Sequence, residues 1–305
     1  MKNWAALMCV WMGCGLAVGQ GTKAARPAIT GISHVTLYAD DLKKSEAFYE
    51  GLLGWEREQA GAGERFYTNH AQYVELVTAP SPGLEKRFVG IGFSTPDAEG
   101  MRRYLGEHGV EVPAAVSVDE KGNRWIAVKD PEGNRIEFTQ QGPHAPKGGK
   151  AAAERVSGDI LHAGLVAHDR AALDRFYQDV LGFHLFWAGG AGPGHTDWVM
   201  MQVGGGQDWL EYMLYLTPTA TREQLGGAYH FSPGVVSVTE LAQKLKNRGW
   251  KDAETIKPLL GLDAKWQLDL RDPDGTRVEF MEFKPVKEPC CRAFTGTEPR
   301  PGAGW

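Results

Sequence analysis

The amino-acid sequence predicts an α+β protein of two tandem domains, each with a curved mixed sheet around a cleft and with helices outside. Two observations predict this fold. A segment of alternating apolar residues that passes into helical periodicity occurs twice, at 32–55 and 160–183. The segments that close the two domains are also alike, at 127–140 and 269–283. The order of elements is therefore a strand, a helix and several strands, four times over.

Each opening segment begins as a strand that carries a histidine and continues into an amphipathic helix with a Leu-Gly stop. Phe-Tyr stands near the end of both helices. Further helices are expected at Asp97–His108 and Thr239–Arg248. Each closing segment contains a type I turn signal, at Asp130–Gly133 and Asp272–Gly275, because Asp, Pro and Gly stand at the positions that this turn favours. An apolar strand with one central glutamate follows each turn.

Composition and charge narrow the class of protein. The chain has 305 residues, of which 42% are hydrophobic and 23% charged, and this suffices for two domains of ordinary size. The net charge is -5, so the chain has no excess of basic residues that would bind phosphates, and no nucleic-acid partner is expected. The domains are expected at 30–141 and 158–284. A polar Gly/Ala-rich linker at 142–157 separates them, and a Pro/Gly-rich tail covers 285–305.

Residues 1–20 have the features of a secretory signal peptide. Lys2 supplies the positive charge, Trp4–Val18 is apolar, and small residues predict cleavage near Ala17–Gln20. The apolar run is shorter than the ~20 residues that span a bilayer. We therefore expect an exported protein, periplasmic or secreted, with no stable membrane insertion after cleavage. A buried N-terminal helix is one alternative; a lipoprotein anchor at Cys14 is another, although the preceding Val-Trp-Met-Gly matches such a signal poorly.

The cysteines exclude a structural disulfide framework. Cys9 and Cys14 would leave with the signal peptide, so Cys290 and Cys291 remain. Adjacent cysteines cannot join distant segments of the chain. Three states stay open for this pair: a vicinal disulfide, a bridge to another chain, or two free thiols.

A histidine and a glutamate recur with one spacing in the second half of the chain. His162 and Glu211 lie 49 positions apart, as do His230 and Glu279, and the two pairs are offset by 68 positions. A duplicated unit that packs about a pseudo-two-fold axis would bring two imidazoles and two carboxylates together. That is the ligand set of a divalent metal ion. Taken singly, each glutamate fits the solvated face of a half-buried strand, and each histidine fits a structural role.

These residues resemble the vicinal oxygen chelate superfamily, which includes glyoxalase I, fosfomycin-resistance proteins, extradiol dioxygenases and bleomycin-resistance proteins. The histidine-bearing first strand, the helix end and the Asp-Pro turn with its glutamate strand carry the resemblance, over residues 30–140 and 158–283. It implies paired βαβββ modules that cup a metal ion or a ligand. The family's ligand positions fall on His162, Glu211, His230 and Glu279, an arrangement similar to that of glyoxalase I.

The first domain departs from this pattern. His34, Glu75 and Glu137 match three ligand positions, but the fourth falls on Gly90, which has no side chain to donate. A three-ligand metal site and a degenerate site are both open. If modules paired across domains, His34 and Glu75 would instead join His230 and Glu279. We favour pairing within each domain, because the domains look like whole duplicates.

The resemblance implies a metal-dependent lyase or isomerase of glyoxalase type. One divalent transition metal (Zn, Ni, Co, Mn or Fe) would act as a Lewis acid on a small substrate that chelates through neighbouring oxygens. Glu279 is the candidate base, and Glu211 could share that role. A Gly-rich loop that ends in His195 could close over the substrate and provide an acid/base or binding group, or be an ordinary hairpin. A homodimer is possible.

Aromatic residues add a further expectation for the second domain. Its tryptophans should be divided between the core and an aromatic pocket: Trp187, Trp198, Trp209, Trp250 and Trp266.

Two other functions stay open. One is an extradiol-type Fe(II) dioxygenase with His162, His230 and Glu279 as a two-His-one-carboxylate site. The dioxygenase signature requires a His and a Tyr just before the Asp-Pro turn, where this chain reads AKWQLDLR, and Glu211 would be a surplus ligand. The other is a non-catalytic small-molecule binding or resistance protein, whose relatives lack the metal ligands.

Overall fold

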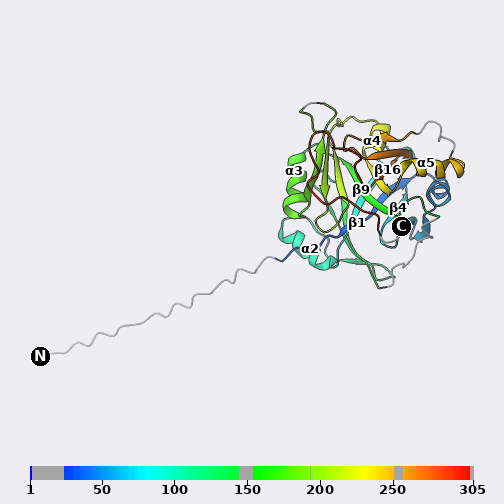
Figure 1. Cartoon of the computed structure of the whole chain (residues 1–305). Helices are drawn as coiled ribbons and strands as arrows, with labels where there is room; N and C mark the ends of the chain where they lie inside the picture. Colours follow the sequence, from blue (N-terminus) through cyan, green and yellow to red (C-terminus); the bar gives the residue numbers. More distant parts are fainter. Residues whose placement is uncertain (2–23, 144–153, 193, 251–256, 303–305) are drawn as a thin grey trace.

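The computed structural model describes residue 1 and residues 24–143, 154–192, 194–250 and 257–302. Nearly all of the expected signal peptide at 1–20, and most of the expected linker, therefore lie outside the described residues. Within them the chain forms two curved mixed sheets of eight strands each, with the helices on their outer sides (Figure 1). This confirms the α+β fold of two tandem domains.

The first sheet has the order β2-β3-β4-β1-β5-β8-β7-β6. Its strands are β1 (Gly31–Ala39), β2 (Glu56–Ala60), β3 (Gly63–Tyr67), β4 (Tyr73–Thr78), β5 (Phe88–Ser94), β6 (Ser117–Val118), β7 (Arg124–Lys129) and β8 (Arg135–Gln140).

The second sheet repeats this order as β10-β11-β12-β9-β13-β16-β15-β14. Its strands are β9 (Asp159–Val166), β10 (His184–Gly189), β11 (Trp198–Gln202), β12 (Trp209–Met213), β13 (His230–Val235), β14 (Leu259–Leu260), β15 (Trp266–Arg271) and β16 (Arg277–Glu282).

Helices connect the strands within each module. The expected helices are confirmed within one residue of their predicted ends, as α2 and α5, and each begins after a side-chain cap, Asp97 or Ser237. The Phe-Tyr segments form a short α-helix that widens into a π-helix. The full set is α1 (Leu42–Glu46), η1 (Ala47–Leu52), α2 (Ala98–Glu107), α3 (Arg170–Asp174), η2 (Arg175–Val180), α4 (Arg222–Ala228) and α5 (Val238–Asn247).

The two modules of each sheet meet along one antiparallel strand pair, β1 with β5 and β9 with β13. On the other side of these strands, β1 runs parallel to β4 and β9 runs parallel to β12. Both modules of a sheet therefore come from the same domain. The alternative in which modules pair across domains is wrong, because the strands of residues 31–140 and 159–282 hydrogen-bond in separate sheets.

The two domains share one apolar core. Trp55 of the first domain lies 6.2 Å from Phe231 of the second between ring centroids, and Phe93 lies 5.1 Å from Phe183. Val35 and Leu37 of β1 are fully buried in the same cluster. The domains are therefore packed face to face. A smaller apolar cluster on the other side of the second sheet includes Trp209, and Phe294 of the tail packs against it.

Reciprocal hydrogen bonds explain the two recurring motifs. The Tyr49 hydroxyl donates to Asp272 Oδ2 at 2.9 Å, and the Tyr177 hydroxyl donates to Asp130 Oδ2 at 3.1 Å. The helix tyrosine of each domain thus binds the turn aspartate of the other. The Asp272 Oδ1 atom also accepts the backbone N–H of Thr276 at 2.8 Å, so one carboxylate holds both its own turn and the neighbouring domain.

The tail packs on the second sheet. Cys290 and Cys291 form a vicinal disulfide, and Phe294 lies 4.8 Å from Phe186 between ring centroids.

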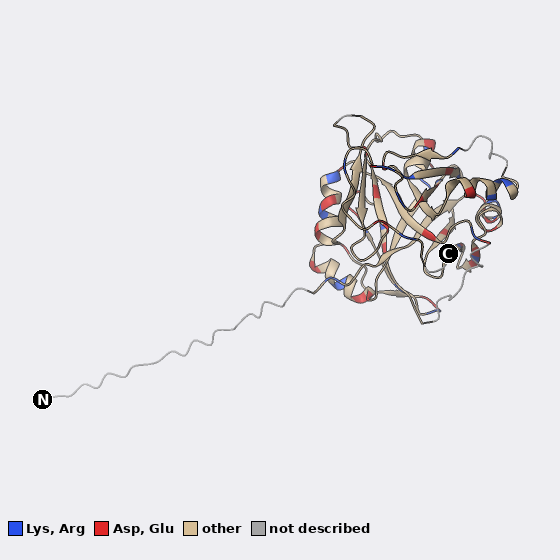
Figure 2. Ribbon diagram, viewed as in Figure 1, with Lys and Arg blue, Asp and Glu red and all other residues tan. Residues whose placement is uncertain are grey.

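Positive and negative residues alternate over the outer helices (Figure 2). Among the described residues, no helix has the length and apolar composition needed to cross a membrane.

The burial of Asp272 predicts a pH-dependent stability. Burial raises the pKa of Asp272 from 3.8 to about 6, against its hydrogen bonds with Thr276 and Tyr49. The folded protein therefore holds this proton between about pH 4 and pH 6, where the unfolded chain has lost it, and stability from this group falls as the pH rises through that window. Asp272→Asn removes the titration and keeps an acceptor oxygen.

Urea unfolding of both proteins at several pH values tests this. The difference in free energy of unfolding, wild type minus Asp272→Asn, should fall by up to about 3 kcal/mol between pH 4 and pH 6.5. A difference that is flat or rises over this range would contradict the assignment.

Candidate metal centre

Two imidazoles and two carboxylates meet at the middle of the second sheet. His162 lies on β9, Glu211 on β12, His230 on β13 and Glu279 on β16, and one ligand atom of each lies within 4.8 Å of all the others. Both histidines are fully buried, and the glutamates are 5% and 3% exposed. This is the one such group of His, Cys, Asp or Glu side chains found among the described residues.

The distances between the ligand atoms are short. The Nε2 atom of His162 lies 3.0 Å from Nε2 of His230 and 3.0 Å from Oε2 of Glu279. The Nε2 atom of His230 lies 3.2 Å from Glu279 Oε2 and 3.3 Å from Glu211 Oε2. Ligands bound at ~2.0–2.2 Å around one transition-metal ion lie ~3.0–3.5 Å from their neighbours. The observed spacing therefore fits a single ion.

A glycine makes room for one of the imidazoles. Gly164 on β9 is paired with His230 on one side and with Glu211 on the other. A Cβ atom at Gly164 would lie 2.1 Å from Cε1 of His230. Because that approach is sterically forbidden, the imidazole reaches the centre only over a residue that has no side chain.

Neighbouring groups orient both rings. The Nδ1 atom of His230 lies 2.8 Å from the carbonyl oxygen of Ala228, so the N–H donates there and Nε2 is left with its lone pair. The His162 ring stacks on Trp209 with ring centroids 4.9 Å apart. Its Nδ1 atom is buried and has no partner among the described residues. Both Nε2 atoms therefore face the centre.

Charge at the centre is arranged for a cation. Burial would raise the pKa of Glu279, but Arg277 and the hydrogen bonds from the two imidazoles hold it well below its ordinary range. Burial lowers the pKa of His162, which favours the neutral imidazole that a metal requires. Burial and Arg277 would lower the pKa of His230, but its hydrogen bonds to the carboxylates of Glu211 and Glu279 raise it. A proton on His230 and a metal ion are alternative ways to balance the two buried carboxylates.

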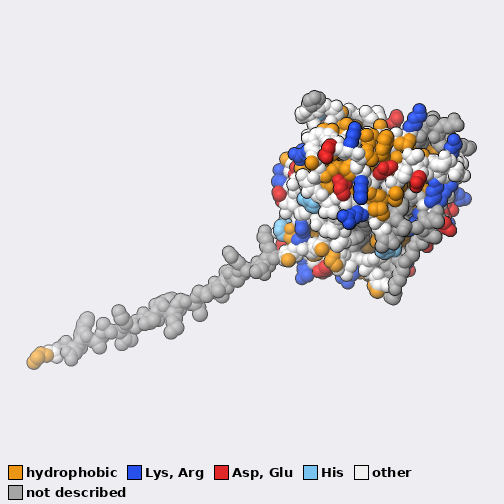
Figure 3. Space-filling view, in the orientation of Figure 1, with side chains coloured by type: hydrophobic (Ala, Val, Ile, Leu, Met, Phe, Trp, Pro, Cys, Tyr) orange, Lys and Arg blue, Asp and Glu red, His pale blue; other side chains and the backbone are white. Residues whose placement is uncertain are grey.

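A cavity of about 330 Å³ opens beside this group. Glu211 and Glu279 line it together with Trp187, Trp198 and Met200. Leu259 and Leu262 also line it and are 60% and 42% exposed. Hydrophobic side chains gather on the face of the molecule seen in Figure 3, among charges of both signs. The cavity combines apolar walls with two carboxylates, which suits a small organic molecule.

The structure does not bring His195 to this group. His195 is exposed on the loop between β10 and β11 and does not line the cavity. Its loop is closed by hydrogen bonds such as that from the N–H of Asp197 to the carbonyl of Gly189 at 2.8 Å.

The tryptophans divide as the sequence predicts. Trp187 and Trp198 line the cavity, and Trp209 supports His162. Trp250 and Trp266 pack against the core.

Sequence reasoning missed Arg277 and Gly164. The Nη1 atom of Arg277 lies 3.1 Å from Glu279 Oε1 and 3.7 Å from Asp269 Oδ2. One signal for it was present, because residues two apart on a strand share a face and Arg277 precedes Glu279 by two. The first domain has the same pair as Arg135 and Glu137. The role of Gly164 depends on strand register, which the sequence alone does not fix.

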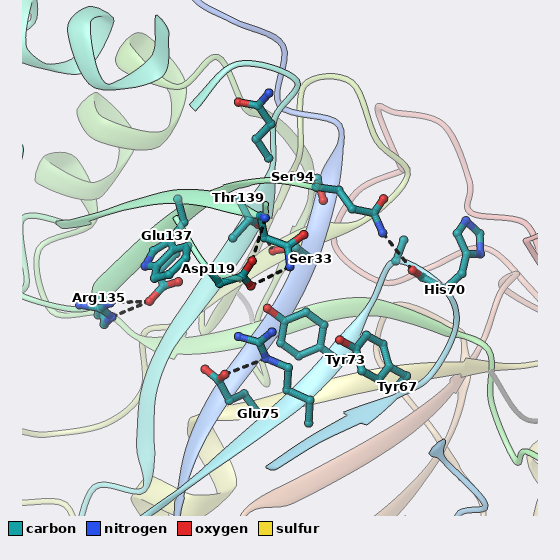
Figure 4. A pocket seen from close by; sticks show the side chains of 16 residues that line it. Ser33, Tyr67, His70, Tyr73, Glu75, Ser94, Asp119, Arg135, Glu137 and Thr139 are labelled. Carbon is teal, nitrogen blue, oxygen red and sulfur yellow. Dashed lines mark hydrogen bonds and ion pairs between the residues drawn. The ribbon is translucent and has the colours of Figure 1, made fainter. Parts of the chain in front are cut away.

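The first domain does not assemble an equivalent group. His34 Nε2 lies 3.5 Å from Glu137 Oε2. The Glu75 carboxylate instead pairs with Arg65 Nε at 2.9 Å (Figure 4). Burial would raise the pKa of Glu137, but His34 and Arg135 lower it to about 2. Of the two alternatives for this domain, the geometry favours the degenerate site.

Comparison with known proteins gives one matching family model. It is described as the Glyoxalase/Bleomycin resistance protein/Dioxygenase superfamily, and it matches residues 31–138 and 159–280.

Solved structures of similar fold include a substrate complex of homoprotocatechuate 2,3-dioxygenase from Brevibacterium fuscum, at 19% identity and a TM-score of 0.63 over 85% of this chain and 82% of that chain. The 2,3-dioxygenase LapB from Pseudomonas sp. KL28 has 16% identity and a TM-score of 0.64 over 87% and 97%. The Mn(II)-bound glyoxalase from Novosphingobium aromaticivorans has 18% identity and a TM-score of 0.64 over 84% and 83%.

Proposed function

The chain belongs to the glyoxalase/bleomycin resistance protein/dioxygenase superfamily, and on this basis we propose that it is a metal-dependent enzyme of glyoxalase type. In this proposal His162, Glu211, His230 and Glu279 hold one divalent transition-metal ion, chosen from Zn, Ni, Co, Mn and Fe. The substrate is a small molecule that chelates the ion through neighbouring oxygens. The reaction is a lyase or isomerase step that moves a proton.

The observation that carries this proposal is the buried fourth ligand. Glu211 lies 3.3 Å from His230 through Oε2 and is 5% exposed, so its carboxylate has been taken out of water and aimed at the other three ligand atoms. A buried carboxylate without a cation is costly. Because the site has two carboxylates, one glutamate can accept a proton from the substrate while the other remains a metal ligand.

The chain's own residues can move that proton. Glu279 and Glu211 both line the cavity, so each carboxylate can reach a substrate proton. Arg277 holds the Oε1 atom of Glu279 at 3.1 Å and leaves Oε2 toward the imidazoles. The bound metal would act as a Lewis acid that stabilises negative charge on the substrate oxygens. Trp187 and Trp198 would exclude water from the substrate's apolar part.

The second candidate is an extradiol-type Fe(II) dioxygenase. His162, His230 and Glu279 lie 3.0–3.2 Å from one another through their ligand atoms, which suits a two-His-one-carboxylate site. Homoprotocatechuate 2,3-dioxygenase shares the fold. Residues 264–271, which include β15, read AKWQLDLR, however, and lack the His and Tyr of the dioxygenase signature.

Two assays of the metal-loaded full chain separate these functions. We expect turnover of the hemithioacetal that methylglyoxal forms with a small thiol, and no oxygen uptake with catechol. Glu279→Gln should lower the turnover at least ~100-fold, because it removes both a ligand and the proposed base. The exposed Glu120→Gln, a control of the same chemistry, should not change it. Oxygen consumption with catechol and none of the first activity would favour the dioxygenase instead.

We further propose that the protein is exported. The support is the signal-like composition of residues 1–20, and the Cys290–Cys291 disulfide suits an oxidising compartment. Mass spectrometry of the protein from its native cells should find a mature chain that begins after Ala17–Gln20. A chain that still carries residues 2–16 would contradict export by this route.

A further inference from the structure

A second cavity lies in the first domain, at the position that corresponds to the metal centre of the second. Its volume is about 280 Å³, and strands of both modules of the first sheet line it. Figure 4 shows Tyr67 and Tyr73 side by side, with Arg135 and Glu137 across the cavity from them. No role in the proposed reaction uses this cavity, so its chemistry is a separate question.

Strand register shows why this cavity lacks a counterpart of the four-residue group. Gly90 is paired with Thr36 on β1, as His230 is paired with Gly164 in the second domain. The small and large residues have therefore changed places. A Cβ atom at Gly90 would lie 2.6 Å from the carbonyl oxygen of Arg135, so no imidazole fits there without movement. The Thr36 hydroxyl instead donates to Glu75 at 3.3 Å.

The two arginines that line the cavity are already paired with carboxylates. The Arg65 Nε atom donates to Glu75 at 2.9 Å, and the Arg135 Nε atom donates to Glu137 at 2.7 Å. The Asp119 carboxylate accepts both the backbone and the side-chain N–H groups of Asn123 in its own turn. An anionic ligand would find no unpaired cation on Arg65 or Arg135, so the walls disfavour an anion.

Aromatic side chains line the cavity among small polar ones such as Ser33 and Thr139. Tyr67, Tyr73 and Trp125 all line the cavity. The Tyr73 ring is held by a parallel stack on His34, with centroids 4.8 Å apart, and by Arg65, whose guanidinium carbon lies 4.9 Å from its centroid. Burial raises the pKa of both phenols, that of Tyr67 to about 12 with the help of Glu58, so their hydroxyl groups stay protonated.

We propose that this cavity is a metal-independent binding site for an uncharged aromatic ring that carries one or two hydroxyl groups. Tyr73 and Tyr67 would hydrogen-bond the hydroxyls, and Trp125 would cover the ring face. The size agrees, because an apolar cavity of about 150 Å³ holds benzene and this one is roughly twice as large.

Resorcinol is the probe that separates this site from the metal centre. Its two hydroxyls are not neighbours on the ring, so it cannot chelate a metal through vicinal oxygens. Calorimetric titration of the full chain should give one equivalent bound with a Kd of about 1 mM or tighter. The affinity should be the same with and without metal, and benzoate and methyl glucoside should bind at least tenfold more weakly.

Variants locate the binding. Tyr73→Phe removes one oxygen atom and Trp125→Leu removes the aromatic wall, and each should weaken resorcinol binding at least tenfold. Trp198→Leu in the cavity of the second domain, and His230→Ala, should leave it unchanged. Urea unfolding of each variant tests whether it is folded. If Trp125→Leu does not fold, the binding measured for Tyr73→Phe decides the proposal.

Three results would overturn the proposal: no binding of resorcinol, binding that disappears with the metal or in His230→Ala, or tighter binding of benzoate or of methyl glucoside. Because the titration also uses metal-free protein, it can fail while the proposed enzyme activity stands, and the reverse also holds.

Discussion

The antiparallel pairing of β9 with β13 is the constraint from which the rest of the second domain follows. It places His230 opposite Gly164 and Ser232 opposite His162, so the two imidazoles are offset and their Nε2 atoms approach to 3.0 Å. The parallel neighbours β12 and β16 then bring one glutamate each to the same place. The four side chains are at most 5% exposed, so polar groups are held together at a position where a proton or a metal ion must balance the charge.

The same pairing in the first domain carries different chemistry. Thr36 and Gly90 stand at the positions of Gly164 and His230. Arg65 neutralises Glu75, whose counterpart in the second domain is Glu211. Duplication therefore preserved the architecture and let the contents of the two clefts diverge. Because the backbone register fixes which side chains meet, Thr36 and Gly90 leave the first domain without a counterpart of the His230 imidazole, although the strand order is the same. The protein as a whole combines one centre built for a cation with one cleft built for an uncharged ring.

Much of this could be predicted from the sequence, because it depends on spacing along the chain. The equal offsets of His162, Glu211, His230 and Glu279 report a duplicated unit, and strand alternation places all four on one face. The Asp-Pro turns and the helix caps are local signals. The contact of Tyr49 with Asp272 was not predictable in this way, because it joins segments 223 positions apart and depends on how the domains pack. The expectation for His195 rested on the composition of a loop, which does not fix where a side chain points.

The central claim is that the second sheet binds one metal ion through its two-fold related His/Glu pairs. The most direct measurement is the metal content of the full chain by elemental analysis, after separate reconstitution with Mn, Fe, Co, Ni and Zn. The account predicts about one tightly bound ion per chain in the wild type. It predicts loss of that ion in His230→Ala and in Gly164→Val, and retention in His34→Ala, whose position in the first sheet matches that of His162 in the second. A wild type that stays free of metal, or a His34→Ala variant that loses metal as fully as His230→Ala does, would contradict it.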